Sequence, residues 1–295
     1  MTRVSIRLAA FAGALLAVGV LAFQASQAQA PAGGTVALTG ARVINGTGAA
    51  PIEGATILIA NGRIEAVGTG AAVKIPAGAT RVDLAGKTVM PGMINAHAHA
   101  NIDPSVKMPA RDQLVQRLRV YADYGVTTAV SLGSSEADEE AGLRLRDENS
   151  SSTLDRARLY TGGINAEGKT PEEARKSVDR LANLKVDVIK YHINGTPMDM
   201  TPDIYGALVD QSKKRGLRTY VHIFNLKDAK GAIEKGTDVI AHSVRDQDVD
   251  QALINEMKSK NIGYIPTLTR DLSVFVYETR PAFFDEPFFQ RGIAL

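Results

Sequence analysis

The stretch TVMPGMINAHAHANID, residues 88–103, places His97 and His99 one residue apart at the end of an apolar run. If the run is a β-strand, its side chains alternate between two faces, so both imidazoles point the same way and can share one ion. The alternative is a strand end that carries two solvated imidazoles, because short motifs also occur by chance. The positions of the other histidines bear on this choice.

The chain after Pro91 alternates between short apolar segments and helical patterns, which is typical of βα units with a parallel sheet. Several of the helical segments begin with Thr-Pro or Asp and end with Gly or Asn. We expect strands within residues 89–99, 125–133, 157–164, 186–193, 218–224, 238–244 and 263–269, and helices within 109–125, 170–185, 201–216, 226–236 and 248–261. About seven βα units in series predict an α/β fold, an incomplete (β/α)8 barrel of the TIM type over residues 91–295 that lacks its last strand.

Residues 31–90 have a different texture, with short alternating β patterns at residues 35–44 and 55–68. Asn61-Gly62 lies between two alternating segments and is a strong signal for a β-hairpin. We therefore predict a small N-terminal β-sandwich unit that precedes the barrel.

The first 30 residues have the composition of a secretory signal peptide. Arg3 and Arg7 precede an apolar stretch at residues 8–23, and Ala28 and Ala30 form an A-x-A cleavage pattern. The alternative is a membrane anchor, but the apolar stretch is shorter than the roughly 20 residues that a spanning helix needs. We expect cleavage after Ala30 and export to the periplasm or the medium, with no membrane span in the mature chain.

Charge and cysteine content limit the classes of binding partner and of metal ligand that the chain can have. Loss of residues 1–30 removes two basic and no acidic residues, so the formal net charge falls from +2 to 0. No basic surface for nucleic acid or lipid is indicated, and a small-molecule substrate is the expected partner. Because the chain has no cysteine, a metal would have to be bound by nitrogen and oxygen ligands.

Four of the five histidines fall at the carboxyl ends of predicted strands. His97 and His99 end the first barrel strand, and His222 and His242 lie near the ends of the strands at 218–224 and 238–244. Active sites of (β/α) barrels are built on this face. One histidine at a strand end is usually structural, but the joint placement favours a metal site.

Lys190 interrupts the apolar segment VDVIKYHI, residues 186–193. An unpaired ammonium there would be costly, so we expect either a salt bridge or a side chain that reaches the rim, or a chemical role. A buried amine that loses its proton can take up carbon dioxide to give a carbamate, an oxygen ligand able to bridge two cations. His192 shares the face of Lys190 and either points at the site or ends the strand.

An ordered set of segments carries a family resemblance: GRIEAVG and GKTVMPGMINAHAH at residues 62–68 and 86–99, VDVIKYH at 186–192, VHIF at 221–224 and GTDVIAHSV at 236–244. The chain resembles the amidohydrolase superfamily, and most closely its exported branch near imidazolonepropionases and prolidase-like dipeptidases. The matching segments extend over nearly the whole mature chain.

The resemblance implies a ligand set and a reaction. His97, His99, His222 and His242 would bind one or two divalent ions, with zinc the expected metal, and Lys190 would be the carboxylated bridge. The activity would be hydrolysis of a C–N amide bond, in a dipeptide or an N-acyl amino acid, through a metal-activated water. Two alternatives stay open, a cyclic amide or lactone hydrolase and an inactive barrel or fragment that binds a metal or ligand.

One departure concerns the general base. The family has an aspartate at the end of its eighth strand, and no aspartate is found in that place before Leu295. His192 and Asp246 are the candidate replacements, although a loop aspartate such as Asp246 is typically solvated. We therefore expect a truncated chain with little activity, whose open sheet edges favour self-association into a homo-oligomer.

Two further residues are candidates for binding a substrate carboxylate. Arg245 and Tyr264 lie near the predicted ends of the sixth and seventh barrel strands. A guanidinium can bind a carboxylate through two parallel hydrogen bonds. The alternative for both is a surface position.

Overall fold

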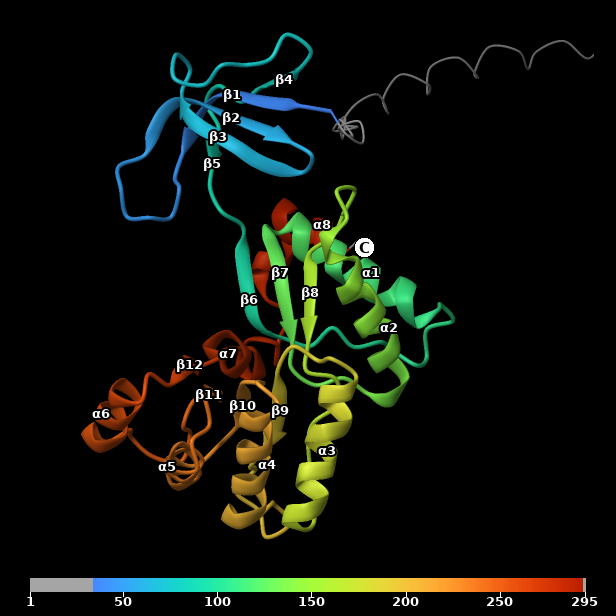
Figure 1. Cartoon of the computed structure of the whole chain (residues 1–295), viewed down its shortest axis with the longest axis vertical. Coiled ribbons are helices and arrows are strands. Elements are labelled where there is room, and N and C mark those ends of the chain that lie inside the picture. The colour runs from blue at the N-terminus through green and yellow to red at the C-terminus, as the bar shows by residue number, and fades with distance from the viewer. Residues whose placement is uncertain (1–33, 294–295) are drawn as a thin grey trace, which may run out of the picture. The chain divides into compact units, whose positions relative to one another are not determined.

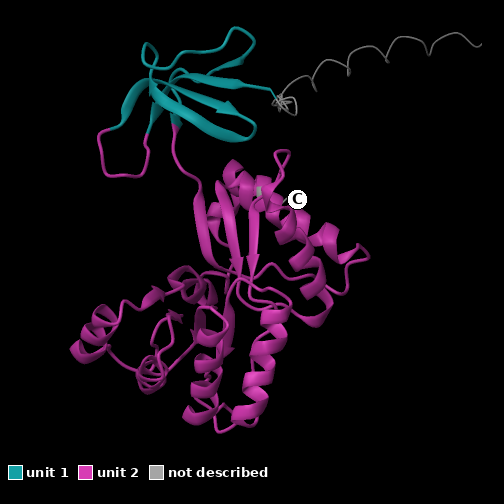
Figure 2. Cartoon of the chain, viewed as in Figure 1, with its two compact units in different colours: residues 1–43, 51–88 teal, residues 44–50, 89–295 magenta. Residues whose placement is uncertain are grey.

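A computed structural model of the chain describes residues 34–293. Two compact units make up the chain: residues 1–43 with 51–88, and residues 44–50 with 89–295 (Figure 2). This division lies close to the predicted one at residues 90 and 91. The predicted signal peptide, residues 1–30, lies outside the described residues. Within residues 34–293, no helix combines the length and apolar character required to cross a bilayer.

The described residues of the first unit form a single sheet. Its strands are β1 (Val36–Val43), β2 (Ile52–Ala60), β3 (Arg63–Thr69), β4 (Thr80–Asp83) and β5 (Thr88–Val89). They lie in the order β3-β2-β1-β4, and β5 also pairs with β1. The predicted sandwich is therefore not confirmed among the described residues, because the two short strands β4 and β5 extend the existing sheet along β1 and form no second layer.

The hairpin between β2 and β3 confirms the turn signal in the sequence. Asn61 and Gly62 both have positive φ, 52° and 73°, and they join the paired residues Ala60 and Arg63. Two successive positive φ values are what a type I′ turn requires, and Asn-Gly adopts them at low cost.

The second unit contains the seven strands that the sequence predicts, all in parallel pairings. They are β6 (Met93–Ala98), β7 (Val126–Ser131), β8 (Arg158–Thr161), β9 (Ile189–His192), β10 (Thr219–His222), β11 (Val239–Ala241) and β12 (Gly263–Ile265). They form two sheets, β6-β7-β8 and β9-β10-β11-β12, which Figure 1 shows with helices alongside.

Helices follow the strands, as a βα pattern requires. They are α1 (Ala110–Asp123), α2 (Glu136–Asp147), α3 (Pro171–Asn183), α4 (Pro202–Lys214), α5 (Leu226–Glu234), α6 (Gln251–Ser259), α7 (Leu268–Val276) and α8 (Pro287–Ile293), with short 3-10 turns η1 (Glu148–Ser150) and η2 (Ala282–Asp285). The start signal acts as predicted at α3, where Thr170 accepts the backbone N–H of Glu173. At α6 the capping residue is Asp250, which accepts the backbone N–H of Leu253 and lies two residues after the start of the predicted segment.

The two sheets meet at β8 and β9 without a ladder between them. Gly162 and Gly163 follow β8, and the carboxylate of Asp187 accepts the backbone N–H of Thr161 at 2.8 Å. Two backbone hydrogen bonds also link the segments around β8 and β9: the N–H of Asp187 donates to the carbonyl of Thr161, and the N–H of Ala166 donates to the carbonyl of Lys190. The unit thus has a TIM-barrel-like α/β fold, whereas a closed barrel is not confirmed.

The packing of the core in the second unit shows which side chains of β9 and β10 lie on the opposite face of the sheet. Ile189 and Tyr191 of β9 are fully buried in an apolar cluster with Leu208 of α4 and Leu181 of α3. Because side chains alternate along a strand, Lys190 and His192 lie on the opposite face. The same alternation places Val221 of β10 in the cluster and leaves His222 on the other face.

Candidate metal centre

His97 and His99, at the end of β6, turn their imidazoles toward each other. Their Nε2 atoms lie 3.2 Å apart. The side chain of Asn95 accepts the backbone N–H of His97 at 3.1 Å and so stabilises the strand end. The structure therefore has the two histidines on one face, as strand alternation predicts.

All five histidines of the chain lie in one group at the carboxyl ends of β6, β9, β10 and β11. His192 and His222 are register partners on β9 and β10. The ring centroids are 4.7 Å apart for His192 and His222, 4.4 Å for His222 and His242, and 4.6 Å for His242 and His97. The sequence prediction that strand ends bring these imidazoles together agrees with this geometry.

Lys190 is 1% exposed, and its Nζ atom has no hydrogen-bond partner. Nor does it form an ion pair with any residue in the described part of the chain. Of the two interpretations that the sequence left open, the salt bridge is therefore absent from the structure. The amine lines the same cavity as the five imidazoles.

Burial is the largest cause of the low pKa values in this group. It lowers the pKa of Lys190 to about 7. It also lowers the pKa of His97 to about 2, with the Lys190 charge as the second cause. For His222 and His242 the pKa is about 3, and for His192 it is about 4, with burial again the largest cause. The imidazoles are thus neutral near pH 7, and each keeps one nitrogen lone pair for a cation or a proton.

The cavity has a volume of about 270 Å³ and is lined by His97, His99, Lys190, His192, His222, His242, Thr267 and Arg270. No acidic side chain is among these lining residues. Sequence reasoning missed Thr267 and Arg270, which follow the end of β12. The strand-end rule that found the histidines would also have found Thr267 if applied to β12.

Thr267 contacts the imidazole of His242. Its Oγ1 lies 2.8 Å from Nδ1 of His242. Both residues have positive φ, 54° for Thr267 and 116° for His242. Such a backbone conformation costs roughly 1–3 kcal/mol for a residue with a side chain and is concentrated at functional sites.

The donors in the cavity fit a divalent cation, although they do not yet form a complete ligand set. Among residues 34–293, no three His, Cys, Asp or Glu side chains are already arranged around one ion position. However, two nitrogen ligands of one tetrahedral zinc ion lie about 3.3 Å apart, which agrees with the 3.2 Å between the Nε2 atoms of His97 and His99. Nδ1 of His97 and Nζ of Lys190 are also buried without partners. Neutral nitrogen donors of this kind suit zinc.

Three of the predicted site residues lie outside the lining of this cavity. Asp246 does not line the cavity, because its Oδ1 accepts the backbone N–H of Leu226 at the start of α5, at 2.9 Å. Arg245 is also outside the lining, since its guanidinium is bound to Asp271 at 2.7 Å. Its charge nevertheless contributes to the low pKa of His222 and His242.

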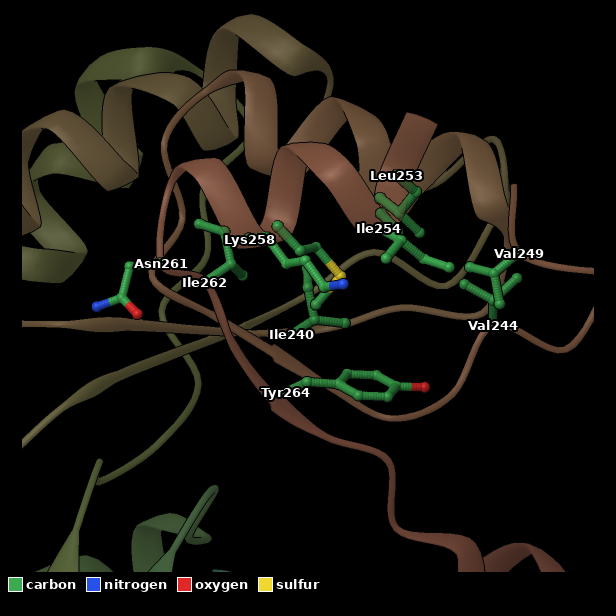
Figure 3. A pocket seen from close by; sticks show the side chains of 11 residues that line it. Ile240, Val244, Val249, Leu253, Ile254, Lys258, Asn261, Ile262 and Tyr264 are labelled. Atoms are coloured by element: carbon green, nitrogen blue, oxygen red, sulfur yellow. The ribbon is translucent and has the colours of Figure 1, made fainter. Parts of the chain in front are cut away.

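Tyr264 lines a different pocket, beside α6. This second pocket has a volume of about 610 Å³ and is mostly apolar, with Ile240, Leu253 and Ile254 among its lining residues. Figure 3 shows the ring of Tyr264 among these side chains. The residue follows Gly263 on β12 and faces away from the histidines, so it is not placed to bind a substrate in their cavity.

Comparison with known proteins supports the family resemblance at the level of fold. No protein-family model matches the chain, and no curated protein matches its sequence. Solved structures do match: molinate hydrolase has a TM-score of 0.67 at 18% identity over 79% of this chain and 63% of its own. A putative prolidase from Bifidobacterium longum has a TM-score of 0.66 at 26% identity, over 80% of this chain and 60% of its own. A Xaa-Pro dipeptidase with methionine bound in the active site has a TM-score of 0.68 at 20% identity, over 88% and 73%.

These neighbours are hydrolases of the amidohydrolase superfamily, and the chain shares their fold. The likeness is one of fold, and it agrees with the family that the sequence motifs predict. The chain spans less than two thirds of the length of the first two neighbours.

Proposed function

We propose that this chain is a metal-dependent amidohydrolase that cleaves the C–N amide bond of a dipeptide or an N-acyl amino acid. The observation that carries the proposal is the group of five neutral imidazoles around the buried, unpartnered amine of Lys190. Buried polar atoms without partners are rare, and at a strand-end cavity they favour a functional site. The shared fold with hydrolases, including a prolidase and a Xaa-Pro dipeptidase, supports the same class of reaction.

The residues that would hold the metal are His97, His99, His222 and His242. Lys190 would add oxygen ligands if its neutral amine bonds the carbon of carbon dioxide and releases a proton, which gives a carbamate. One or two divalent ions, with zinc preferred, would then lie in the cavity. A bound cation of this kind lowers the pKa of water and polarises a carbonyl group.

His192 is the residue on this face that is left for proton transfer. Its ring lies 4.7 Å from that of His222 and lines the cavity. Because its imidazole is neutral near pH 7, one ring nitrogen can accept a proton from the attacking water and return it to the leaving amine nitrogen. Asp246 does not line the cavity, and its Oδ1 accepts the backbone N–H of Leu226 instead.

Arg270 gives the cavity its preference for anionic substrates. It lines the cavity, and its side chain is 61% exposed while it contacts Asp271 at 3.3 Å. An exposed guanidinium at the rim can bind the carboxylate of a dipeptide or N-acyl amino acid through two hydrogen bonds. The small volume of the cavity favours short substrates.

The cellular setting belongs to the same proposal. Export to the periplasm or the medium, with cleavage after Ala30, agrees with a small-molecule substrate taken from outside the cytoplasm. Self-association through the edges of the two sheets is part of the proposal as well.

The experiment is hydrolysis of a panel of dipeptides and N-acyl amino acids by the purified chain, with zinc and after chelation. We expect slow release of the amine product with zinc, because no acidic side chain lines the cavity to act as the base, and we expect loss of this release on chelation and in His222→Ala. Tyr264→Phe is the matched control and should keep the activity, because Tyr264 lies in the other pocket. Turnover that survives both chelation and His222→Ala would contradict the proposal.

A second candidate is a protein that binds a divalent ion without turnover. It is favoured by one observation, that none of the described residues lining the cavity is acidic, so a carboxylate base is not placed there. Stoichiometric zinc together with no hydrolysis of any panel member would support this candidate over the first.

A further inference from the structure

Thr267 occupies the N-cap of α7 but does not cap that helix. Threonine at this position usually accepts a backbone N–H from the first turn, as Thr170 does for α3 at 3.2 Å from the N–H of Glu173. The side chain of Thr267 makes no such bond to α7. Its hydroxyl oxygen lies 2.8 Å from Nδ1 of His242 instead, so the side chain contributes to the cavity and not to the helix.

The backbone around this contact has an unfavourable conformation at both partners. Thr267 has φ 54° and His242 has φ 116°, in a region that favours glycine, and a β-branched residue is especially disfavoured there. The backbone N–H of His242 donates to the carbonyl of Ile265 at 2.9 Å, so the ends of β11 and β12 are joined beside the contact. A threonine that neither caps its helix nor adopts a relaxed backbone is best explained by its contact with the imidazole.

We propose that Thr267 is a positioning residue that fixes the ring and the tautomer of His242. In this arrangement Nδ1–H of His242 donates to Oγ1 of Thr267, and Nε2 keeps the lone pair of the neutral ring. The inference rests on the proposed metal site, because the nitrogen left without a proton is the one that would bind the cation. A threonine that donated to Nδ1 would produce the opposite tautomer, with a proton on Nε2 and no lone pair for a metal.

The expected effect follows from what such partners do for metal-binding histidines. A hydrogen bond to the second ring nitrogen orients the imidazole, and its loss typically lowers metal affinity about 10- to 100-fold. Removal of the Thr267 hydroxyl should therefore weaken metal binding without removal of any ligand.

The experiment compares Thr267→Ala and Thr267→Ser in the full chain. Nitrogen chemical shifts of the histidine rings in metal-free, ¹⁵N-labelled protein report the tautomer of His242, and titration with Co²⁺ reports affinity through its absorption spectrum. We expect the Nδ1–H tautomer in the wild type and in Thr267→Ser. In Thr267→Ala we expect a mixture of tautomers and a Co²⁺ affinity about 10- to 100-fold lower.

Two further variants, at Thr267 and Thr170, serve as controls. Thr267→Gly also removes the hydroxyl and relaxes the left-handed backbone, so it replaces the alanine variant if that variant does not fold. Thr170→Ala removes a threonine that does cap a helix, and it should lower stability but leave both the tautomer and the Co²⁺ affinity unchanged.

The proposal is overturned if His242 has the Nε2–H tautomer in the wild type, or if the hydroxyl-free variants keep the wild-type tautomer and affinity. Failure of the proposed function has a different signature. A wild-type chain that binds no Co²⁺ would contradict the metal site, while the ring shifts of His242 in the metal-free protein would still decide the role of Thr267.

Discussion

Replacement of Lys190 by methionine should make the metal-free protein more stable. The lysine is 1% exposed and its Nζ atom has no hydrogen-bond partner. Leaving a buried polar group unsatisfied costs about 1–3 kcal/mol, and methionine has a similar length without a polar end. We therefore expect Lys190→Met to raise the free energy of unfolding by about 1–3 kcal/mol in the presence of chelator. For a unit of this size, that gain corresponds to a rise in Tm of roughly 2–4 °C per kcal/mol.

Added zinc should remove or reverse the difference in stability between Lys190→Met and the wild type. A ligand at 100 times its Kd stabilises the native state by about 2.7 kcal/mol, and this gain should be present in the wild type but diminished in Lys190→Met, which has lost a metal-site residue. The wild type would then equal or exceed the variant. Thermal and urea unfolding, each with chelator and with zinc, measure both comparisons.

The matched control is Leu208→Met, which introduces methionine at another fully buried position. A volume-conserving apolar change of this kind costs less than about 1.5 kcal/mol, so it should not stabilise the protein. If Lys190→Met lowers the stability of the metal-free protein by more than Leu208→Met does, the amine has a partner and the reasoning is wrong.

Three further predictions concern the metal site, the second pocket and the core. His97→Ala and His222→Ala should each lower the zinc content markedly, since each removes a nitrogen ligand; elemental analysis with unchanged zinc in both would refute the ligand assignment. Tyr264→Phe should leave zinc content and Co²⁺ affinity unchanged, because the residue lines the apolar pocket; a clear drop would place Tyr264 at the site after all. Leu114→Ala, at a fully buried position of α1, should cost about 2–5 kcal/mol of unfolding free energy, and a loss well below this range in urea unfolding would show a loosely packed core.

The sequence predicted the strands of the second unit because each is a short apolar segment between a helix and a turn. The Asn61-Gly62 turn was also predictable, because few residue pairs adopt two successive positive φ values. Closure of the barrel could not be predicted from the sequence. It depends on hydrogen bonds between distant segments, and at β8 and β9 the side chain of Asp187 takes a backbone N–H that a ladder would need.

The part of the site that lies on strands was predictable, because alternation along a strand determines the face of the sheet to which each side chain points. Period two predicted that His97 and His99 share a face and that His192 shares the face of Lys190, while His222 was predicted from its place at a strand end. The structure brings these side chains together. Loop residues do not follow this rule, because their direction depends on turns and local partners. Arg245 was predicted at the site but is bound to Asp271, while Thr267 was missed because the strand-end rule was not applied to the threonine that follows β12.

The gap between the two sheets has a consequence for how the second unit moves. No ladder joins β6-β7-β8 to β9-β10-β11-β12, and isolated hydrogen bonds such as Asp187 N–H to Thr161 O link them instead. We therefore expect each sheet to open locally as a separate cooperative unit. The imidazoles of the cavity come from both sheets, with His97 and His99 on one side and His192, His222 and His242 on the other. A cation shared between them would couple the two openings, and amide hydrogen exchange in β6 and β10 would then slow together when metal is added.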